Sequence, residues 1–288
     1  MNQFRRAMEV ETIIAYFVCD DTIKELKIKE DMQITMSMAE VMTTAIIGAQ
    51  LFSGNLEKAR RALKSNRYFP SMLSKSQFNR RLHSIPKYLW PIILERFFCE
   101  LDKNRLIKEF VIDSFPVPTC KLVRMNRSKL YSDKKYLGYC AVRNEFFVGM
   151  KLHLISDVCG NPKQYLILPA SESDIAGLHK TDLSLPKNSS LYGDKAYNDY
   201  AHEDRLVQEK QVHLLPIRKR NSKRGGIEFF SRIRQKKRKI IETVFSCIEK
   251  LMPRSIHAVT RAGFELKIIC FVLAYAVNNR PLSKLKIL

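Results

Sequence analysis

Apolar and polar residues follow one pattern in the first third of the chain and another in the rest. Near the start, apolar residues gather in runs of helical length, and residues 39–52 predict a helix that Gly54 and Asn55 would end. Residues 56–63 predict a second helix whose basic side chains face outward. Short helices therefore dominate this part of the chain.

Two further helix starts follow. Ser74 and Gln77 have the spacing of a capping box, and Pro86 opens a helix that runs toward Leu101. The helix after Ser74 begins with basic residues, including Arg80 and Arg81, which we take as candidate DNA contacts. We expect residues 1–105 to form an all-helical N-terminal DNA-binding region of helix-turn-helix type, although a plain helical bundle with a charged face explains the same pattern equally well.

After Glu109 the pattern changes to that of a sheet. Residues 146–155 alternate, with apolar side chains on one face and Lys151 and His153 on the other. Further strands are predicted over 110–113, 164–168, 190–194 and 212–217, with helices over 174–182 and 198–210. Hairpin strands followed by helix–strand alternation indicate an α/β fold, in which helices pack on both faces of a mixed sheet.

The last part of the chain combines a basic segment with apolar helices. We interpret residues 218–239 as a basic loop and residues 241–252 as a helix with a buried stripe, which Pro253 ends. Another apolar helix is predicted over 262–279, and its apolar run, 268–277, is about half the roughly 20 residues that cross a membrane. We therefore expect a buried helix and no membrane partner, and we assign residues 106–288 to one catalytic domain with C-terminal helices.

The charge of the chain favours a polyanionic partner. Fifty Lys and Arg against 29 Asp and Glu give a net charge of +21, and residues 212–288 alone carry 18 basic and 4 acidic residues. Such concentration is typical of nucleic-acid binding through counterion release, although a solvated basic surface is the simpler alternative. The candidate contacts outside the helical region are Lys151, Lys195, Arg218, Lys219, Arg220, Arg232, Arg234, Lys236, Lys237, Arg238 and Lys239.

A second basic segment lies between the predicted strands. It combines six basic residues with three aromatic ones, Lys121, Arg124, Arg127, Lys129, Lys134 and Lys135 with Tyr131, Tyr136 and Tyr139. These side chains are suited to hold a DNA backbone and unstacked bases, while a solvated loop is the equally plain alternative.

The cysteines and the N-terminus favour the cytoplasm. Seven cysteines are scattered singly without a C-x-x-C pair, and the first residues lead into no apolar signal core. We expect a cytoplasmic protein associated with the nucleoid.

Three acidic residues stand out in this basic chain. Asp113 and Asp194 end predicted strands, and Glu242 lies on the helix behind the basic segment. Singly, each has an ordinary explanation: a turn-initiating Asp, a helix-entry Asp, and an i,i+4 ion pair between Arg238 and Glu242. Together, carboxylates from two strand ends and a helix can hold divalent metal next to DNA.

Four phrases carry a resemblance to a known family. Residues 112–116, 149–153, 191–197 and 239–246 resemble the Asp-Asp-Glu transposases of bacterial insertion sequences, most of all the insertion sequence nine-eighty-two group. The resemblance covers roughly residues 70–280 and implies a ribonuclease-H-like core, with Asp113, Asp194 and Glu242 as catalytic and metal-binding triad and Arg238 in contact with DNA. The family often has a Tyr three residues before that Arg and a Lys seven after the Glu. Here Gln235 and Glu249 stand there, so those roles are not transferred.

The expected function follows from the residues and the resemblance together. We expect a DNA transposase that uses two Mg²⁺ (or Mn²⁺) ions about 4 Å apart to cut strands and join them to target DNA. Its partner would be double-stranded DNA, both terminal repeats and target, bound by a homodimer that brings two element ends together. A nuclease or resolvase on the same scaffold and a catalytically silent DNA-binding protein are the alternatives.

Overall fold

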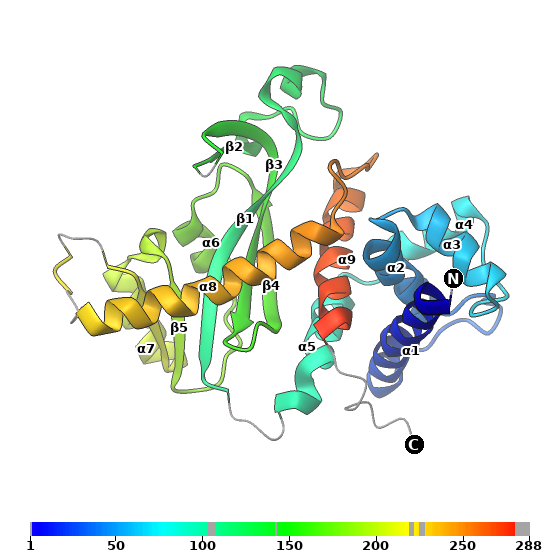
Figure 1. Cartoon of the computed structure of the whole chain (residues 1–288), viewed down its shortest axis with the longest axis horizontal. Helices are drawn as coiled ribbons and strands as arrows, with labels where there is room; N and C mark the ends of the chain where they lie inside the picture. The colour runs from blue at the N-terminus through cyan, green and yellow to red at the C-terminus, as the bar shows by residue number, and fades with distance from the viewer. Residues whose placement is uncertain (1, 103–106, 142, 219–221, 225–227, 280–288) are drawn as a thin grey trace. The chain divides into compact units, whose positions relative to one another are not determined.

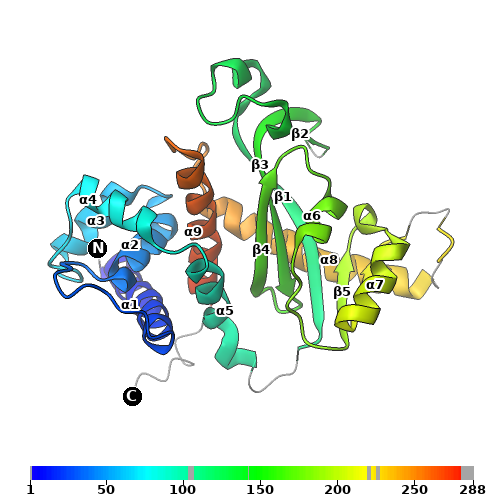
Figure 2. The ribbon, with the colours of Figure 1, turned by 180° about the vertical axis from the view of Figure 1, so that it is seen from behind.

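The protein forms two compact units, which are described separately. A computed structural model describes residues 2–102, 107–141, 143–218, 222–224 and 228–279, and the side chains of these except 2–7, 99–102 and 228–231. One unit comprises Met1–Asn104 with Ile248–Leu288, and the other comprises Arg105–Cys247. Figure 1 labels the helices and strands, and Figure 2 shows them from behind.

The described part of the first unit is helical. Its helices are α1 (Asn2–Glu25), α2 (Met38–Phe52), α3 (Leu56–Ser65), α4 (Lys75–Ser84), α5 (Leu89–Asp102) and α9 (Arg261–Asn279). Side chains fix three of the starts: Ser37 and Ser74 form capping boxes with Glu40 and Gln77, and Asn55 caps α3. The predicted capping box at Ser74 is confirmed.

Helix α9 packs with the N-terminal helices. Ten of its residues are buried, and α9 contacts α1, α2 and α5, so this helix groups with the first unit, whereas the sequence placed it with residues 106–247. With 19 residues α9 is, by length and composition, the one helix of the described residues that would be able to cross a membrane. Slightly more than half of its apolar window, 56%, is buried within the protein, as in the core helix of a globular unit.

A half-buried carboxyl in this unit makes its stability depend on pH. Burial raises the pKa of Glu11 from 4.5 to about 7, although a hydrogen bond with Gln50 opposes the shift. The protonated Glu11 carboxyl is therefore favoured more strongly in the folded state than in the unfolded state. Its contribution to the free energy of unfolding is fully present below about pH 4.5 and is lost as the pH rises through about 7.

We expect the free energy of unfolding of this unit to fall by on the order of 1–2 kcal/mol across that window, since water screens a half-buried group in part. Urea titrations followed by the fluorescence of Trp90, the only tryptophan and buried in α5, measure this unit. Glu11→Gln should remove the pH dependence, and an unchanged dependence would contradict the assignment.

The second unit is built on a mixed sheet of six strands. They are β1 (Glu109–Lys121), β2 (Leu137–Cys140), β3 (Glu145–Asp157), β4 (Pro162–Pro169), β5 (Ser189–Gly193) and β6 (Val212–Pro216). The order is β2-β3-β1-β5-β6, with β4 also paired to β3. Strands β1 and β3 are antiparallel, whereas β1, β5 and β6 are mutually parallel, so the predicted mixed α/β fold is confirmed.

Helices cover both faces of this sheet. On one face α6 (Asp174–Lys180) and α7 (Tyr200–Lys210) bury Leu178 and Leu206 against a core that includes Ile112. On the other, α8 (Glu228–Leu251) packs Phe245 on Phe115, with ring centroids 5.4 Å apart. Figures 1 and 2 show α8 in front of the sheet in one view and α6 and α7 in front in the other. Short 3₁₀ turns complete the unit: η1 (Leu122–Arg127), η2 (Lys134–Tyr136) and η3 (Lys195–Tyr197).

Two elements differ from the sequence prediction. The first strand is 13 residues long, not the four predicted at 110–113, because its second half pairs with β3 despite two prolines. The predicted basic loop is wrong from residue 228 onward, because α8 begins at Glu228. Arg, Lys and Gln are good helix formers, so a run of positive charge does not prevent a helix that has an apolar stripe.

The close approach of β1 and β3 depends on Gly149. A Cβ at this position would overlap the carbonyl oxygen of Val117 and lie 3.0 Å from the Cα of Pro118. We expect Gly149→Ala to destabilise the unit by about 3 kcal/mol, because backbone atoms of a paired strand cannot move aside cheaply. The thermal unfolding midpoint measures this. Gly263→Ala, where the nearest atom is the Oγ1 of Thr260 at 3.1 Å, should change stability by less than about 1 kcal/mol.

Candidate functional site

Two of the three predicted carboxylates come from neighbouring parallel strands. In the pairing of β1 with β5, Val111 lies opposite Tyr192. Two residues further on, this register reaches Asp113 within β1 and Asp194, which directly follows the end of β5. Adjacent strands lie about 4.8 Å apart, so both carboxylates belong to the same edge of the site.

The third carboxylate is joined to the first by a cation from α8. The Nε of Arg238 lies 3.6 Å from Oδ2 of Asp113, and its Nη2 lies 3.2 Å from Oε1 of Glu242. The side chain of Asp113 is 13% exposed, whereas that of Glu242 is 50% exposed. The Arg238 guanidinium thus links a nearly buried carboxylate, Asp113, to a half-exposed one, Glu242.

The environment of Asp113 opposes its ionisation. Burial raises the pKa of Asp113 to about 6, and the negative charges of Asp194 and Asp174 act in the same direction. The backbone N–H of Ser114, which donates to Oδ1 at 2.8 Å, and the Arg238 guanidinium lower this pKa. A carboxyl at this position therefore favours a positively charged partner.

Asp174 is a fourth acid at the site, and sequence reasoning assigned it only to a helix start. It does begin α6, with Ser173 as the cap, but its Oδ1 also accepts hydrogen bonds from Ser114 Oγ at 2.6 Å and Lys151 Nζ at 3.2 Å. The only signal in the sequence was an acid in a first helical turn, which is common and says nothing of the partner strand.

A buried phenol lies among these acids. Tyr197 is fully buried, its hydroxyl has no hydrogen-bond partner in the described structure, and burial together with Asp174, Asp113 and Asp194 raises its pKa well above 10.0. Asp194 itself accepts from the Ala196 N–H at 2.6 Å, which fixes the turn between β5 and Tyr197. Sequence reasoning missed Tyr197 because buried aromatic residues after a strand are usually core.

The oxygen atoms at this site are ligands of the kind that hard metal ions prefer, but they do not form a complete ligand set. Asp113, Asp194 and Glu242 offer oxygen ligands of the kind that Mg²⁺ and Mn²⁺ prefer, and a guanidinium already serves as the shared cation of two of them. As the side chains stand, the described residues contain no group of three or more His, Cys, Asp or Glu able to hold a metal ion. A metal would require Arg238 to turn away and the carboxylates to move closer.

The candidate DNA-binding cations fall into two groups. Five are exposed: Arg80, Lys195, Arg232, Lys236 and Lys239. The last three are four and three residues apart on α8 and therefore form one stripe of that helix, which we call the α8 stripe. Lys219 and Arg220 lie outside the described residues.

The other candidates that the structure describes are only partly exposed, and their contacts inside the protein are known. Arg81 pairs with Glu30, Lys237 with Glu109 at 2.8 Å, and Arg234 donates to the Pro216 carbonyl at 3.1 Å. Lys151 donates to the Glu172 carbonyl at 2.7 Å as well as to Asp174. Their role in DNA binding stays a prediction. To bind DNA, each of these side chains would have to break a contact inside the protein.

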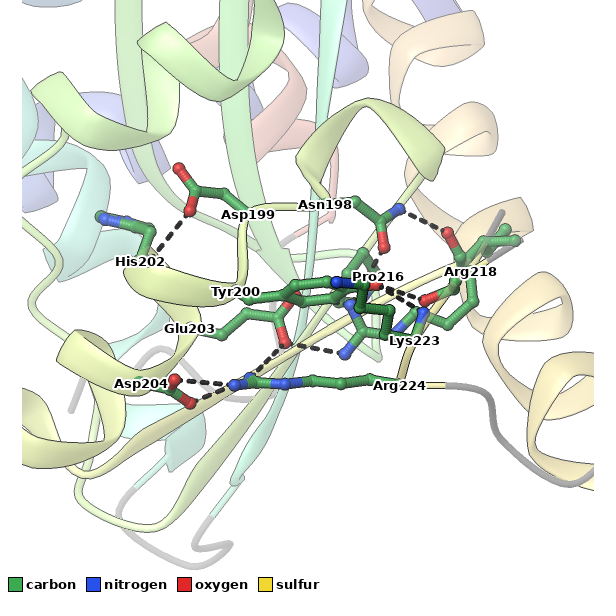
Figure 3. A network of polar contacts seen from close by, with 12 residues as sticks. Asn198, Asp199, Tyr200, His202, Glu203, Asp204, Pro216, Arg218, Lys223 and Arg224 are labelled. Atoms are coloured by element: carbon green, nitrogen blue, oxygen red, sulfur yellow. Dashed lines mark hydrogen bonds and ion pairs between the residues drawn. The ribbon is translucent and has the colours of Figure 1, made fainter. Parts of the chain in front are cut away.

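Arg218 belongs to a network centred on Glu203, shown in Figure 3. The nearly buried Glu203 accepts two hydrogen bonds from Arg218, at 2.6 and 2.7 Å, and one from Arg224 at 3.3 Å. Arg224 also binds Asp204 through two bonds of 2.9 and 2.7 Å, and both guanidinium groups lie over the ring of Tyr200. The network therefore ties the start of the basic segment to α7.

The same network reaches the turn after Asp194. Asn198 accepts from Arg218 at 3.0 Å and donates to the carbonyls of Lys195 and Ile217, at 2.9 and 2.8 Å. Arg218 and Asn198 thereby join the segment after β6 to the segment after η3, and η3 begins directly after Asp194. Sequence reasoning read Arg218 only as a DNA contact because nothing local marks Glu203, 15 residues earlier, as its partner.

One carboxylate on a strand, one directly after the neighbouring parallel strand and a third on a basic helix form a set of charges that is suited to an acidic, phosphate-bearing polymer. Residues 104–260 match the family model described as a transposase DDE domain, which is more than half of the 288 residues, and the chain belongs to this family. A comparison with curated proteins found no match. Membership indicates a transposase with DNA as its partner, and DDE transposases generally use divalent metal ions.

Proposed function

We propose that the protein is an insertion-sequence transposase that cuts the ends of its element and joins them to target DNA. The observation that carries this proposal is that Asp113 and Glu242 share the Arg238 guanidinium, with Asp194 beside Asp113 by strand register, in a chain of the transposase DDE family. The finer assignments belong to the same proposal: a ribonuclease-H-like core, a helical DNA-binding N-terminal domain, and membership of the insertion sequence nine-eighty-two group.

The three carboxylates would hold two Mg²⁺ ions, which when bound activate the attacking oxygen and stabilise the leaving one. Asp113 and Asp194 supply the rigid part of the oxygen donor set, because both are fixed by backbone N–H groups. Glu242 supplies the movable part from the exposed side of α8.

Arg238 would exchange its acid partners for a DNA phosphate. In the resting protein its guanidinium compensates Asp113 and Glu242. The α8 stripe, Arg232, Lys236 and Lys239, would take the neighbouring phosphates. A homodimer in the cytoplasm, associated with the nucleoid, would hold the two element ends.

Purified protein with Mg²⁺ and end-labelled DNA carrying the sequences that flank its reading frame provides the test. A transposase gives a nick at one fixed position and joined products that contain the labelled 3′ end. A nuclease or resolvase cuts without joining to target DNA, and a silent DNA-binding protein shifts the DNA in a gel without cutting it. Either of these two results would contradict the proposal.

A further inference from the structure

The end of the sheet formed by β2 and β3 carries two exposed aromatic rings. Tyr139 and Phe146 are cross-strand partners, and their ring centroids lie 5.1 Å apart. They are 52% and 54% exposed, whereas Tyr131 and Tyr136 of the same region are buried. Of the three tyrosines that the sequence singled out here, only Tyr139 is open to a ligand.

The Tyr139 ring is held in place before any ligand arrives. Its hydroxyl donates to Asn144 Oδ1 at 2.6 Å, and its ring packs against that of Phe146 at an interplanar angle of 56°. A ring fixed in this way loses little conformational entropy when a flat ligand stacks on it. Two neighbouring aromatic rings that stay exposed gain little stability from burial in the folded protein. Their exposure therefore favours a role in binding over a role in the core.

Positive charge in the middle of the chain is concentrated around these rings. Residues 121–146 contain seven basic and two acidic residues, while the rest of 106–211 contains eight basic and eleven acidic ones. Lys121, Arg124 and Arg127 are exposed, and η1, which carries the two arginines, packs against β1 and β3. In Figures 1 and 2 η1 and β2 lie at the same end of the sheet. The surroundings therefore complement a polyanion.

The rings share a sheet face with the proposed catalytic carboxylates. Asp113 pairs with Leu154 on β3, and Phe146 lies eight residues before Leu154, an even number, so both point to the same side. Eight residues of extended strand span at most about 26 Å, which corresponds to about eight nucleotides at roughly 3.4 Å each.

We propose that Tyr139 and Phe146 form a stacking platform for an unpaired DNA base, about eight nucleotides from the phosphate that reacts at Asp113. Lys121, Arg124 and Arg127 hold the backbone on either side of this base. The inference rests on the proposed function for its substrate and names a part of the DNA that the catalytic carboxylates do not touch. An aromatic surface in a basic setting is selective for unpaired bases, because only these expose a face.

The test uses duplex DNA of the element end that has a short unpaired stretch eight nucleotides from the cut. One base of this stretch is 2-aminopurine, an adenine analogue whose fluorescence falls when it stacks on another ring. Without metal, the unchanged protein should quench the probe and bind this DNA about 5- to 150-fold more tightly than the fully paired duplex. Tyr139→Ala and Phe146→Ala should lose most of the quenching and of the preference. Tyr139→Phe and Phe146→Tyr keep the rings and should retain both.

Val207→Ala is the control, since Val207 is an exposed apolar residue of α7, on the opposite face of the sheet, and this variant should behave as the unchanged protein. Equal binding of the two DNAs by the unchanged protein, or full quenching by both alanine variants, would overturn the inference. So would alanine variants that change only self-association in sedimentation, since the rings would then contact another protein molecule. Stacking with no cutting in Mg²⁺ would refute the proposed function while supporting the platform.

Discussion

Replacing Asp113 by Asn is expected to reduce metal-dependent DNA cleavage by roughly a thousand-fold or more, while DNA affinity changes little. A divalent ion stabilises the charge that develops in phosphoryl transfer by several kcal/mol, and about 1.36 kcal/mol corresponds to a factor of ten in rate. Asn keeps the shape of the side chain but removes the negative charge. Asp194→Asn and Glu242→Gln should have the same effect, since all three are proposed to hold the same pair of ions.

The measurement is the single-turnover rate of nicking of a labelled element end, with gel-shift affinity determined in parallel. Glu249→Gln is a suitable control because Glu249 is also exposed on α8 and stands where the family often has a Lys. It should cut at the normal rate. Normal cleavage by all three carboxylate variants would refute the proposed triad, whereas a parallel loss of DNA binding would indicate a folding defect instead.

Replacing Glu203 by Gln is expected to destabilise the sheet unit by roughly 3 kcal/mol. Glu203 and Arg218 have side chains that are only 6% and 13% exposed. Removing one partner of such a buried pair leaves the other charge desolvated without compensation, and this typically costs about 3–5 kcal/mol. Hydrogen exchange of the amides in α7 and β6 measures the loss where it occurs.

Two internal controls belong to this experiment. Asp204→Asn breaks the neighbouring pair with Arg224, whose side chains are 56% and 42% exposed, and should cost less than about 1 kcal/mol. The Trp90 transition reports the helical unit and should stay unchanged in both variants. Equal protection of α7 in the Glu203 and Asp204 variants would show that the network in Figure 3 adds no more than an ordinary surface pair.

Much of the fold was predictable because its signals are local. Ser74 with Gln77 is a local cap, and the alternation of 146–155 and the buried stripe after residue 240 are local periodicities. The extension of β1 to Lys121 was not predictable, because its pairing with β3 and the absence of a side chain at Gly149 decide it. The start of α8 was misjudged because charge was taken as a sign of a loop.

The candidate site divides in the same way. Asp113, Asp194 and Glu242 were named because each follows or interrupts a recognisable element, and their catalytic role stays a prediction. Asp174, Tyr197 and Glu203 were not found, since their importance lies in partners from distant segments, such as Ser114 for Asp174 and Arg218 for Glu203. A single sequence gives the positions of charges but not which of them neutralise one another.

The α8 stripe and Glu242 belong to one continuous helix, so the distance and the angle between them are fixed by helix geometry. Ten residues separate Arg232 from Glu242, about 15 Å at 1.5 Å per residue, and no bending loop lies between them. One extra residue inserted between Lys239 and Glu242 would rotate the carboxylate by about 100° relative to the cations. If the protein cuts DNA as proposed, the cutting position depends on the helical phase between these cations and the carboxylate, which even a single-codon insertion would shift.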